Sequence, residues 1–299
     1  MPQLALKIDV DTWRGTRVGV PRLLDVLIQH QARATFLFSL GPDHTGRAWK
    51  RVFRRGFLSK VSRTSVLEHY GLKTLLYGVL LPGPDIGRHC AEILRSARQA
   101  GHETGIHCWD HVRWQDQVAG RDAAWTEAEM RRALERYVDI FGVAPRVHGA
   151  AGWQMNAAAY GLETVLGFAY ASDTRGSEPF IPVIDGVTHV CPQLPTTLPT
   201  LDELIGVDGI TVANVHEHLL DLTRHSPEHG HVYTLHAELE GQKLLPVFER
   251  LLSGWQMQGY RLCSLGELFA TLDPARLPHH RIVHGEIAGR SGQLALQAG

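Results

Sequence analysis

The sequence predicts an α/β fold with a mostly parallel sheet, and three observations support this. Short apolar runs of strand length alternate with segments whose apolar residues recur at helical spacing. The 299 residues, 44% of them hydrophobic, can bury a large core in one α/β barrel or two smaller domains. No internal repeat or clear linker divides the chain. We therefore expect one domain over residues 1–273.

Each expected element has its own local signals. The strands are apolar runs bounded by turn residues, such as the Gly41-Pro42 pair after the second run. The helices are amphipathic and two end at a glycine, Gly101 and Gly142, with Thr126 as the expected N-cap of the helix that Gly142 ends. In chain order we place strands at 4–10, 33–40, 102–108, 232–239 and 260–265. We place helices at 20–30, 86–101, 126–142, 243–259 and 266–272.

Composition excludes several classes of function. A formal net charge of −1 gives no polycationic character, so we expect no nucleic-acid partner. The four cysteines are widely spaced without a C-x-x-C pair, as is typical of reduced thiols in a cytosolic compartment. No stretch approaches the roughly 18 to 20 apolar residues of a membrane-spanning helix. Nothing in the sequence indicates a protein partner.

The two ends of the chain give separate predictions. The N-terminus has neither a basic region nor a long apolar region, which argues against a secretory signal. Residues 274–299 are polar and contain several glycines, so we expect them to form a flexible tail.

A basic segment follows the second expected strand. Residues 47–63 carry seven Lys or Arg side chains with no acid before Glu68, and aromatic and aliphatic residues are interleaved with them. Such a segment can lie in the headgroup region of an anionic membrane. The alternative is a solvated basic helix that packs its apolar side on the domain. On the first interpretation residues 43–85 form a docking insertion, in which the candidate contacts are Arg47, Lys50, Arg51 and Arg54.

Two carboxylates follow the first strand. Asp9 and Asp11 in "KIDVDT" point the same way because strand side chains alternate. They lie at the carboxyl end of the strand, where α/β folds build their sites. Two like charges this close usually require a metal, another cation or a shared proton. The alternative is that Asp11 caps the next segment and Asp9 merely ends the strand.

Histidines occur at two other strand ends. His107 ends the third strand and His111 follows four residues later, so that a helical turn would bring both rings to one ion. Two imidazoles with one carboxylate are a usual ligand set for an open catalytic metal site. His236, near the end of a late strand, is a natural general acid. For each histidine alone, a structural role is the alternative.

These motifs together resemble the polysaccharide deacetylase family of metal-dependent amide and ester hydrolases. The resemblance covers about Leu4 to Leu272 and rests on D-x-D, H-x-x-x-H, "AAGW", "SDTRG" and "TLHAELEG" in that order. More narrowly, "KIDVDTWRGTRVGVPRLL", "HCWDHVRWQ", "LPTTLPTLDELIG" and "VYTLHAELEG" are similar to the branch that deformylates 4-deoxy-4-formamido-L-arabinose on undecaprenyl phosphate. That reaction belongs to the lipid A modification that gives polymyxin resistance.

The resemblance implies a fold, a cofactor and a role for each motif residue. The fold would be an incomplete (β/α)7-type barrel with a basic insertion after the second strand. One divalent ion, zinc by its ligand set but also manganese, cobalt, nickel or iron, would be held by Asp11, His107 and His111. Asp9 would be the general base and His236 the general acid.

Other roles are implied less directly. Asp173 matches the acid that family members use near the catalytic histidine. The arginine that orients the base in the family is missing from "VHGAAGWQ", and Arg175 is the candidate to replace it. Trp109 and Trp153 are expected at the sugar.

The implied partners are a lipid-linked sugar and an anionic membrane surface, at the cytoplasmic face of the bacterial inner membrane. Two other functions remain open. One is a deacetylase of another amino sugar, of the peptidoglycan or chitooligosaccharide type. The other is a non-catalytic binding relative, which would not need the intact acid, base and ligand residues.

Overall fold

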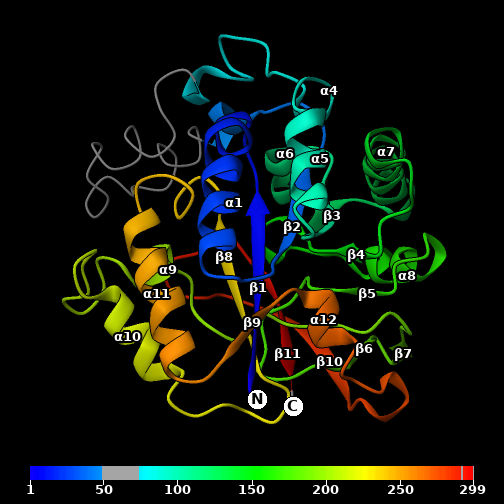
Figure 1. Cartoon of the computed structure of the whole chain (residues 1–299). Helices are drawn as coiled ribbons and strands as arrows, with labels where there is room; N and C mark the ends of the chain where they lie inside the picture. Colours follow the sequence, from blue (N-terminus) through cyan, green and yellow to red (C-terminus); the bar gives the residue numbers. More distant parts are fainter. Residues whose placement is uncertain (49–73, 291, 299) are drawn as a thin grey trace.

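A curved parallel sheet of seven strands forms the centre of the molecule (Figure 1). The computed structural model describes residues 1–48, 74–290 and 292–298. The strand order is β5-β4-β3-β2-β1-β8, with β9 also pairing with the start of β1. The strands are β1 (Gln3–Val10), β2 (Thr35–Ser39), β3 (Glu103–Cys108), β4 (Val147–His148), β5 (Tyr170–Ala171), β8 (His231–His236) and β9 (Arg261–Cys263). The predicted incomplete barrel is confirmed.

Helices cover the outer side of this sheet. The even-numbered residues of β1 lie in the main buried cluster between sheet and helices, in which Leu4, Leu6 and Ile8 are fully buried. The helices of the first half are α1 (Val20–Gln29), α4 (Ile86–His89), α5 (Ala91–Gln99), α6 (His111–Gln117), α7 (Ala123–Phe141) and α8 (Ala157–Val165). Those of the second half are α9 (Leu201–Leu204), α10 (Val215–Leu222), α11 (Leu245–Met257) and α12 (Leu265–Phe269). Helix α12 differs, because its Leu265 and Leu268 pack with Ala5 of β1 in a second cluster. No helix among the described residues is long and apolar enough to cross a membrane.

Helix α7 begins earlier than predicted. Asp122, rather than Thr126, is its N-cap, because the Asp122 carboxylate accepts a hydrogen bond from Trp125 N at 2.9 Å. Thr126 lies inside the first turn and donates to Asp122 O at 2.9 Å. The last residue, Phe141, is followed by Gly142 with φ 70°, as the predicted glycine stop requires.

The prediction of a flexible tail at residues 274–299 is wrong for its described part. There β10 (His279–Gly285) and β11 (Leu294–Ala298) pair with each other. With β6 (Ile181–Ile184) and β7 (Val187–Thr188) they form a second sheet of four strands. Leu294 and Ala295 are fully buried. The polar composition of this segment does not reveal its strands, because β10 pairs with β6, about a hundred residues earlier in the chain.

The carboxyl edge of the parallel sheet gathers the predicted site residues. His107 lies at the end of β3 and His236 at the end of β8, while Asp9 is the last residue but one of β1. Asp9 and His236 are register partners on neighbouring strands. Side chains on the odd-numbered residues of β1 point to the concave side of the sheet, because the even-numbered ones face the helices.

Candidate active site

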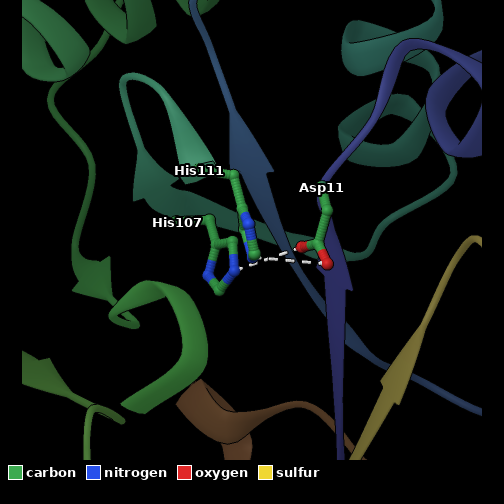
Figure 2. A group of neighbouring side chains, drawn as sticks. All are labelled: Asp11, His107 and His111. Atoms are coloured by element: carbon green, nitrogen blue, oxygen red, sulfur yellow. Dashed lines mark ion pairs between the residues drawn. The ribbon is translucent and has the colours of Figure 1, made fainter. Parts of the chain in front are cut away.

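The three predicted metal ligands lie together (Figure 2). Asp11 follows β1, His107 is the last residue but one of β3, and His111 is the first residue of α6. His107 Nε2 is 3.2 Å from Asp11 Oδ1, and His111 Nε2 is 3.4 Å from Asp11 Oδ2. Two imidazole nitrogens thus face the two oxygens of one carboxylate.

This arrangement fits a divalent cation. The Nδ1 atom of His107 lies 2.6 Å from Gly149 O, a pure acceptor, so Nδ1 carries the proton. In the neutral ring, Nε2 then directs a lone pair at Asp11 Oδ1, which is favourable only with a cation or a second proton nearby. Burial alone would raise the pKa of Asp11, yet the charges of His111 and His107 hold it far below its usual range. Burial alone would lower the pKa of His107, but the charges of Asp9 and Asp11 raise it above its usual value.

Helix α6 positions His111. Its N-cap is Asp110, whose Oδ1 accepts from Arg113 N at 3.1 Å. The other oxygen of Asp110 is 2.6 Å from Nδ1 of His44, which anchors the cap to the segment after β2. The cap starts the helix one residue before His111 and so places this ring beside that of His107, with centroids 5.3 Å apart.

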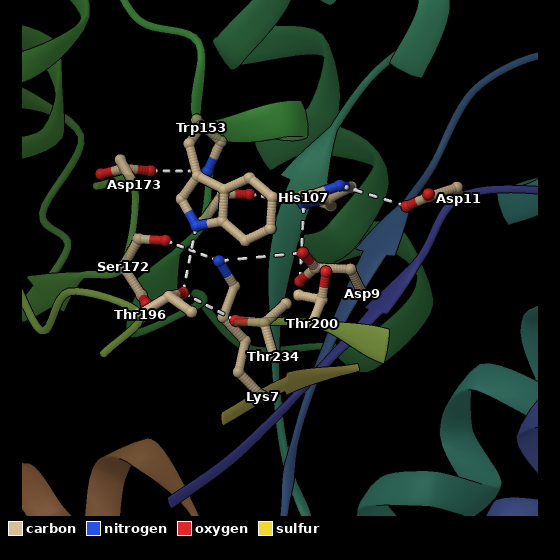
Figure 3. Close-up of polar contacts among 12 residues, drawn as sticks. Lys7, Asp9, Asp11, His107, Trp153, Ser172, Asp173, Thr196, Thr200 and Thr234 are labelled. Atoms are coloured by element: carbon tan, nitrogen blue, oxygen red, sulfur yellow. Dashed lines mark hydrogen bonds and ion pairs between the residues drawn. The ribbon is translucent and has the colours of Figure 1, made fainter. Parts of the chain in front are cut away.

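Lys7 is the cation that contacts the proposed base Asp9 (Figure 3). Its Nζ lies 3.8 Å from Asp9 Oδ2, donates to Ser172 O at 2.7 Å and lies 5.3 Å from the centroid of the Trp153 ring. Lys7 is fully buried and Asp9 is 2% exposed. Burial lowers the pKa of Lys7, against the opposing effect of Asp9. Sequence reasoning missed Lys7, although it shares a strand face with Asp9.

Arg175, the predicted partner of Asp9, points elsewhere. Its guanidinium pairs with Glu203 Oε1 at 2.6 Å, donates to Leu198 O at 3.2 Å and covers the Trp153 ring at 5.0 Å. Lys7, rather than Arg175, is therefore the basic side chain beside the Asp9 carboxylate, whose other oxygen lies 3.9 Å from His107 Nδ1.

His236 lies beside Asp9 on the neighbouring strand. Its backbone N–H donates to Glu240 Oε2 at 2.9 Å, and its ring Nδ1 is buried without a hydrogen-bond partner. The charge of His236 lowers the pKa values of both Asp11 and Asp202, though less than burial raises them. In the sheet, β8 lies on the other side of β1 from β2 and β3, so His236 and His107 come to Asp9 from opposite sides of its strand.

Asp173 contacts a different histidine from the one predicted. Its Oδ1 is 2.9 Å from Nδ1 of His148, and its Oδ2 accepts from Gln193 Nε2 at 3.0 Å. His148, Glu163 and Asp173 form a buried cluster, in which each residue is at most 2% exposed. Among the described contacts of Asp173, none joins it to His236.

The residues predicted to contact the substrate lie in different parts of the molecule. Trp153 is 1% exposed, its Nε1 donates to Thr196 Oγ1 at 3.0 Å, and its ring faces Lys7 Nζ, so the ring is buried inside the domain. Trp109 packs on Gly41 and lies under the Arg136 guanidinium, at 5.0 Å from ring centroid to Cζ. Arg47 donates to Gly78 O at 3.0 Å. The other three predicted basic contacts, Lys50, Arg51 and Arg54, lie outside the described residues.

A family model described as polysaccharide deacetylase matches residues 4–170, which include the three predicted metal ligands and Asp9. The chain belongs to the polysaccharide deacetylase family. Two similar proteins align with nearly its whole length. One, from Shewanella sediminis, is named "Probable 4-deoxy-4-formamido-L-arabinose-phosphoundecaprenol deformylase ArnD" and is 38% identical over 99% of this chain and 95% of its own. A protein of the same name from Wigglesworthia glossinidia brevipalpis is 32% identical over 95% and 98%.

Solved structures show the same fold at low sequence identity. A Puue allantoinase superimposes with a TM-score of 0.63 at 15% identity, over 91% of each chain. A family 4 acetyl xylan esterase from Clostridium thermocellum, in complex with a cobalt ion, gives a TM-score of 0.52 at 14% identity over 93% of this chain and 97% of its own. These similarities establish the curved parallel sheet as the polysaccharide deacetylase fold.

Proposed function

We propose that this protein is a metal-dependent hydrolase that removes the formyl group from 4-deoxy-4-formamido-L-arabinose linked to undecaprenyl phosphate. One observation carries the proposal. The carboxylate and two imidazoles of the centre lie beside Asp9 and His236, in a chain similar over 95% or more of its length to two proteins that bear the deformylase name. The reaction would belong to lipid A modification and polymyxin resistance, at the cytoplasmic face of the inner membrane.

The metal would be held by Asp11, His107 and His111. A set of three protein ligands is typical of catalytic sites, which keep a further coordination position for water or substrate. When bound, a divalent ion supplies Lewis-acid chemistry that polarises a carbonyl and lowers the pKa of water. Zinc suits the ligand set, and manganese, cobalt, nickel and iron share it.

The chain's own residues would move the protons. Asp9, held by Lys7, accepts a proton from the water that attacks the formyl carbon. His236, on the neighbouring strand, donates a proton to the sugar nitrogen as the C–N bond breaks and formate leaves. Each such acid–base role is typically worth on the order of 10²–10⁴ in rate.

A membrane surface would be reached through the loop before α4. Here Val79, Leu80 and Leu81 are 40%, 76% and 38% exposed, an unusual apolar group on a water-soluble surface. Gly78 O in this loop accepts from Arg47 Nε at 3.0 Å, which brings a basic side chain to the apolar group. The loop lies on the side of the molecule toward which the carboxyl end of β1 points (Figure 1). Apolar and basic side chains together suit an anionic lipid surface.

Formate release from the lipid-linked sugar tests the reaction. We expect formate only with the divalent ion present, and little acetate from the N-acetyl analogue of the same lipid. Faster release of acetate would instead favour a deacetylase, and binding without turnover would favour a non-catalytic relative.

Vesicle sedimentation tests the docking loop. Leu80→Glu should weaken binding to vesicles of phosphatidylglycerol and phosphatidylethanolamine, because it places a charge in the apolar group. Val165→Glu is a matched control, since Val165 is 70% exposed but ends α8. Equal binding by the two variants would contradict the assignment of this loop.

A further inference from the structure

A single peptide unit connects the metal ligand His107 to the buried carboxylate of Asp173. Its carbonyl, Gly149 O, lies 2.6 Å from His107 Nδ1. Its amide, Ala150 N, donates to Asp173 Oδ1 at 2.6 Å. His107, Ala150 and Asp173 are each at most 1% exposed, so water does not compete for these two hydrogen bonds. A continuous series of hydrogen bonds therefore connects the Asp173 carboxylate to the His107 imidazole, which faces Asp11.

Asp173 is held rigidly in an ionised form. Its backbone N–H donates to Gln193 Oε1 at 3.0 Å, and Gln193 Nε2 returns a bond to Asp173 Oδ2 at 3.0 Å. Burial alone would raise the pKa of Asp173, but the charge of His148 and hydrogen bonds from Glu163, His148 and Gln193 keep it below its usual value. Burial and the nearby Asp173 raise the pKa of Glu163, so this neighbour is the protonated one. The cluster therefore contains one carboxylate charge, located on Asp173.

The peptide can approach both partners because residue 149 is a glycine. A Cβ there would lie 2.3 Å from Leu37 Cδ1 and 3.3 Å from Lys7 Cε, so a side chain at this position would require Leu37 or the peptide to move. Gly149 is also anchored by its own N–H, which donates to Ile106 O at 2.9 Å.

We propose that Asp173 is a positioning residue for the metal centre, acting on His107 through the Gly149–Ala150 peptide. Hydrogen bonds in series polarise one another, so a negative charge at the amide end strengthens the carbonyl as an acceptor. A stronger acceptor holds the proton on His107 Nδ1, fixes the ring and leaves Nε2 directed toward the centre. Partners of this kind around metal-bound histidines are typically worth 10- to 100-fold in metal affinity.

A second ion in the cluster of His148, Glu163 and Asp173 is the competing interpretation. Ligand atoms from these three residues lie within 4.8 Å of one another. However, Gln193 Nε2 already donates to Glu163 Oε2 at 3.1 Å and to Asp173 Oδ2 at 3.0 Å, and Ala150 N occupies Asp173 Oδ1. An ion would have to displace these donors. We therefore expect one metal per chain.

Metal affinity of two isosteric variants tests the proposal. Asp173→Asn keeps an oxygen that can accept from Ala150 N but removes the charge. We expect it to weaken Co(II) and Zn(II) binding about tenfold, in competition with a chromophoric chelator, and to shift the visible Co(II) bands. The control is Glu163→Gln, which replaces a protonated acid by a neutral amide in the same cluster. Its affinity and spectrum should match those of the wild type.

Three results would overturn the proposal. The first is an unchanged metal affinity in Asp173→Asn. The second is an equal loss of metal affinity in Asp173→Asn and Glu163→Gln, which would indicate a general packing effect. The third is a stoichiometry of two metals that falls to one in either variant. Thermal unfolding of the metal-free proteins identifies loss of affinity that comes from loss of fold.

A measurement on the wild type keeps the test decisive if Asp173→Asn does not fold. When Zn(II) binds, the Ala150 amide proton should move downfield in a nitrogen-correlated NMR spectrum, because the peptide becomes more polarised. The Gly149 amide, which donates to the neutral Ile106 carbonyl, is the internal reference. A shift at Ala150 no larger than that at Gly149 would show that the peptide does not transmit the interaction.

Discussion

Replacing Lys7 gives the sharpest test of how the proposed base is held. Lys7 is fully buried, and its Nζ lies 3.8 Å from Asp9 Oδ2. At an effective dielectric constant of about 20, two unit charges at this distance attract by about 4 kcal/mol, which corresponds to roughly a thousandfold effect on an equilibrium. In bulk water the same pair would interact by about 1 kcal/mol. Burial therefore makes this one cation important to Asp9.

We expect Lys7→Met and Lys7→Gln to lower kcat/KM for formate release by about 10²- to 10³-fold. The estimate lies below the full Coulomb term because water or rearranged dipoles will compensate for part of the lost charge. Glutamine can still donate to Ser172 O, the 2.7 Å contact that Lys7 makes, whereas methionine cannot. Similar activity losses in the two variants would thus identify the charge, rather than this hydrogen bond, as the important property.

The assay should separate activity from folding. Removing a buried charge also removes its desolvation cost, so we expect only a modest change in thermal stability. Activity is therefore compared at a temperature where circular dichroism shows all three proteins folded. If Lys7→Gln retains kcat/KM within about threefold of the wild type, the Coulomb argument for Lys7 fails.

Three further predictions concern other parts of the molecule. Asp9→Asn should retain the metal but lose turnover by at least about 10²-fold, whereas His107→Ala should lose the metal. Metal analysis together with kinetics distinguishes the two variants. Near-normal activity of Asp9→Asn would exclude Asp9 as the general base. Burial raises the pKa of Glu240 to about 7, so between about pH 4.5 and pH 7 the folded protein binds more protons than the unfolded chain. The free energy of unfolding should therefore fall by about 3 kcal/mol as the pH rises through this range. Urea unfolding at pH 5 and pH 8 should show this loss in the wild type and not in Glu240→Gln. Deleting residues 279–298 should lower Tm by about 5 °C or more, because it removes two strands and a fully buried leucine; an unchanged Tm would contradict their structural role.

The centre itself could be predicted from local patterns. Strand alternation places Asp9 and Asp11 on one face, and parallel strands bring their carboxyl ends to one edge, so that His107 had to lie near them. The position of His111 needed only one helical turn, which Asp110 starts as N-cap. These arguments use neighbours in sequence or a general rule of the fold.

Residues whose role depends on distant partners could not be predicted. Lys7 lies two residues before Asp9, but a strand lysine is normally exposed, and its burial depends on Trp153 and Ser172, more than 140 residues away. Family position matched Asp173 to an acid near the catalytic histidine, whereas the fold brings it to His148. A long-range pairing of this kind has no local signal in one sequence.

The position of Lys7 also bears on the different functions proposed for the two neighbouring carboxylates. Asp9 and Asp11 share a strand face, and a divalent ion beside them would attract both. Asp11 faces two imidazoles, while the buried Lys7 supplies a competing positive charge to Asp9. The lysine therefore favours an Asp9 carboxylate that stays outside the ligand set and available to accept a proton. It follows that Lys7→Met should bind Zn(II) more tightly than the wild type, as Asp9 joins the ligands, while it turns over more slowly. Weaker zinc binding in this variant would mean that Lys7 supports the whole centre rather than separating the base from the ligands.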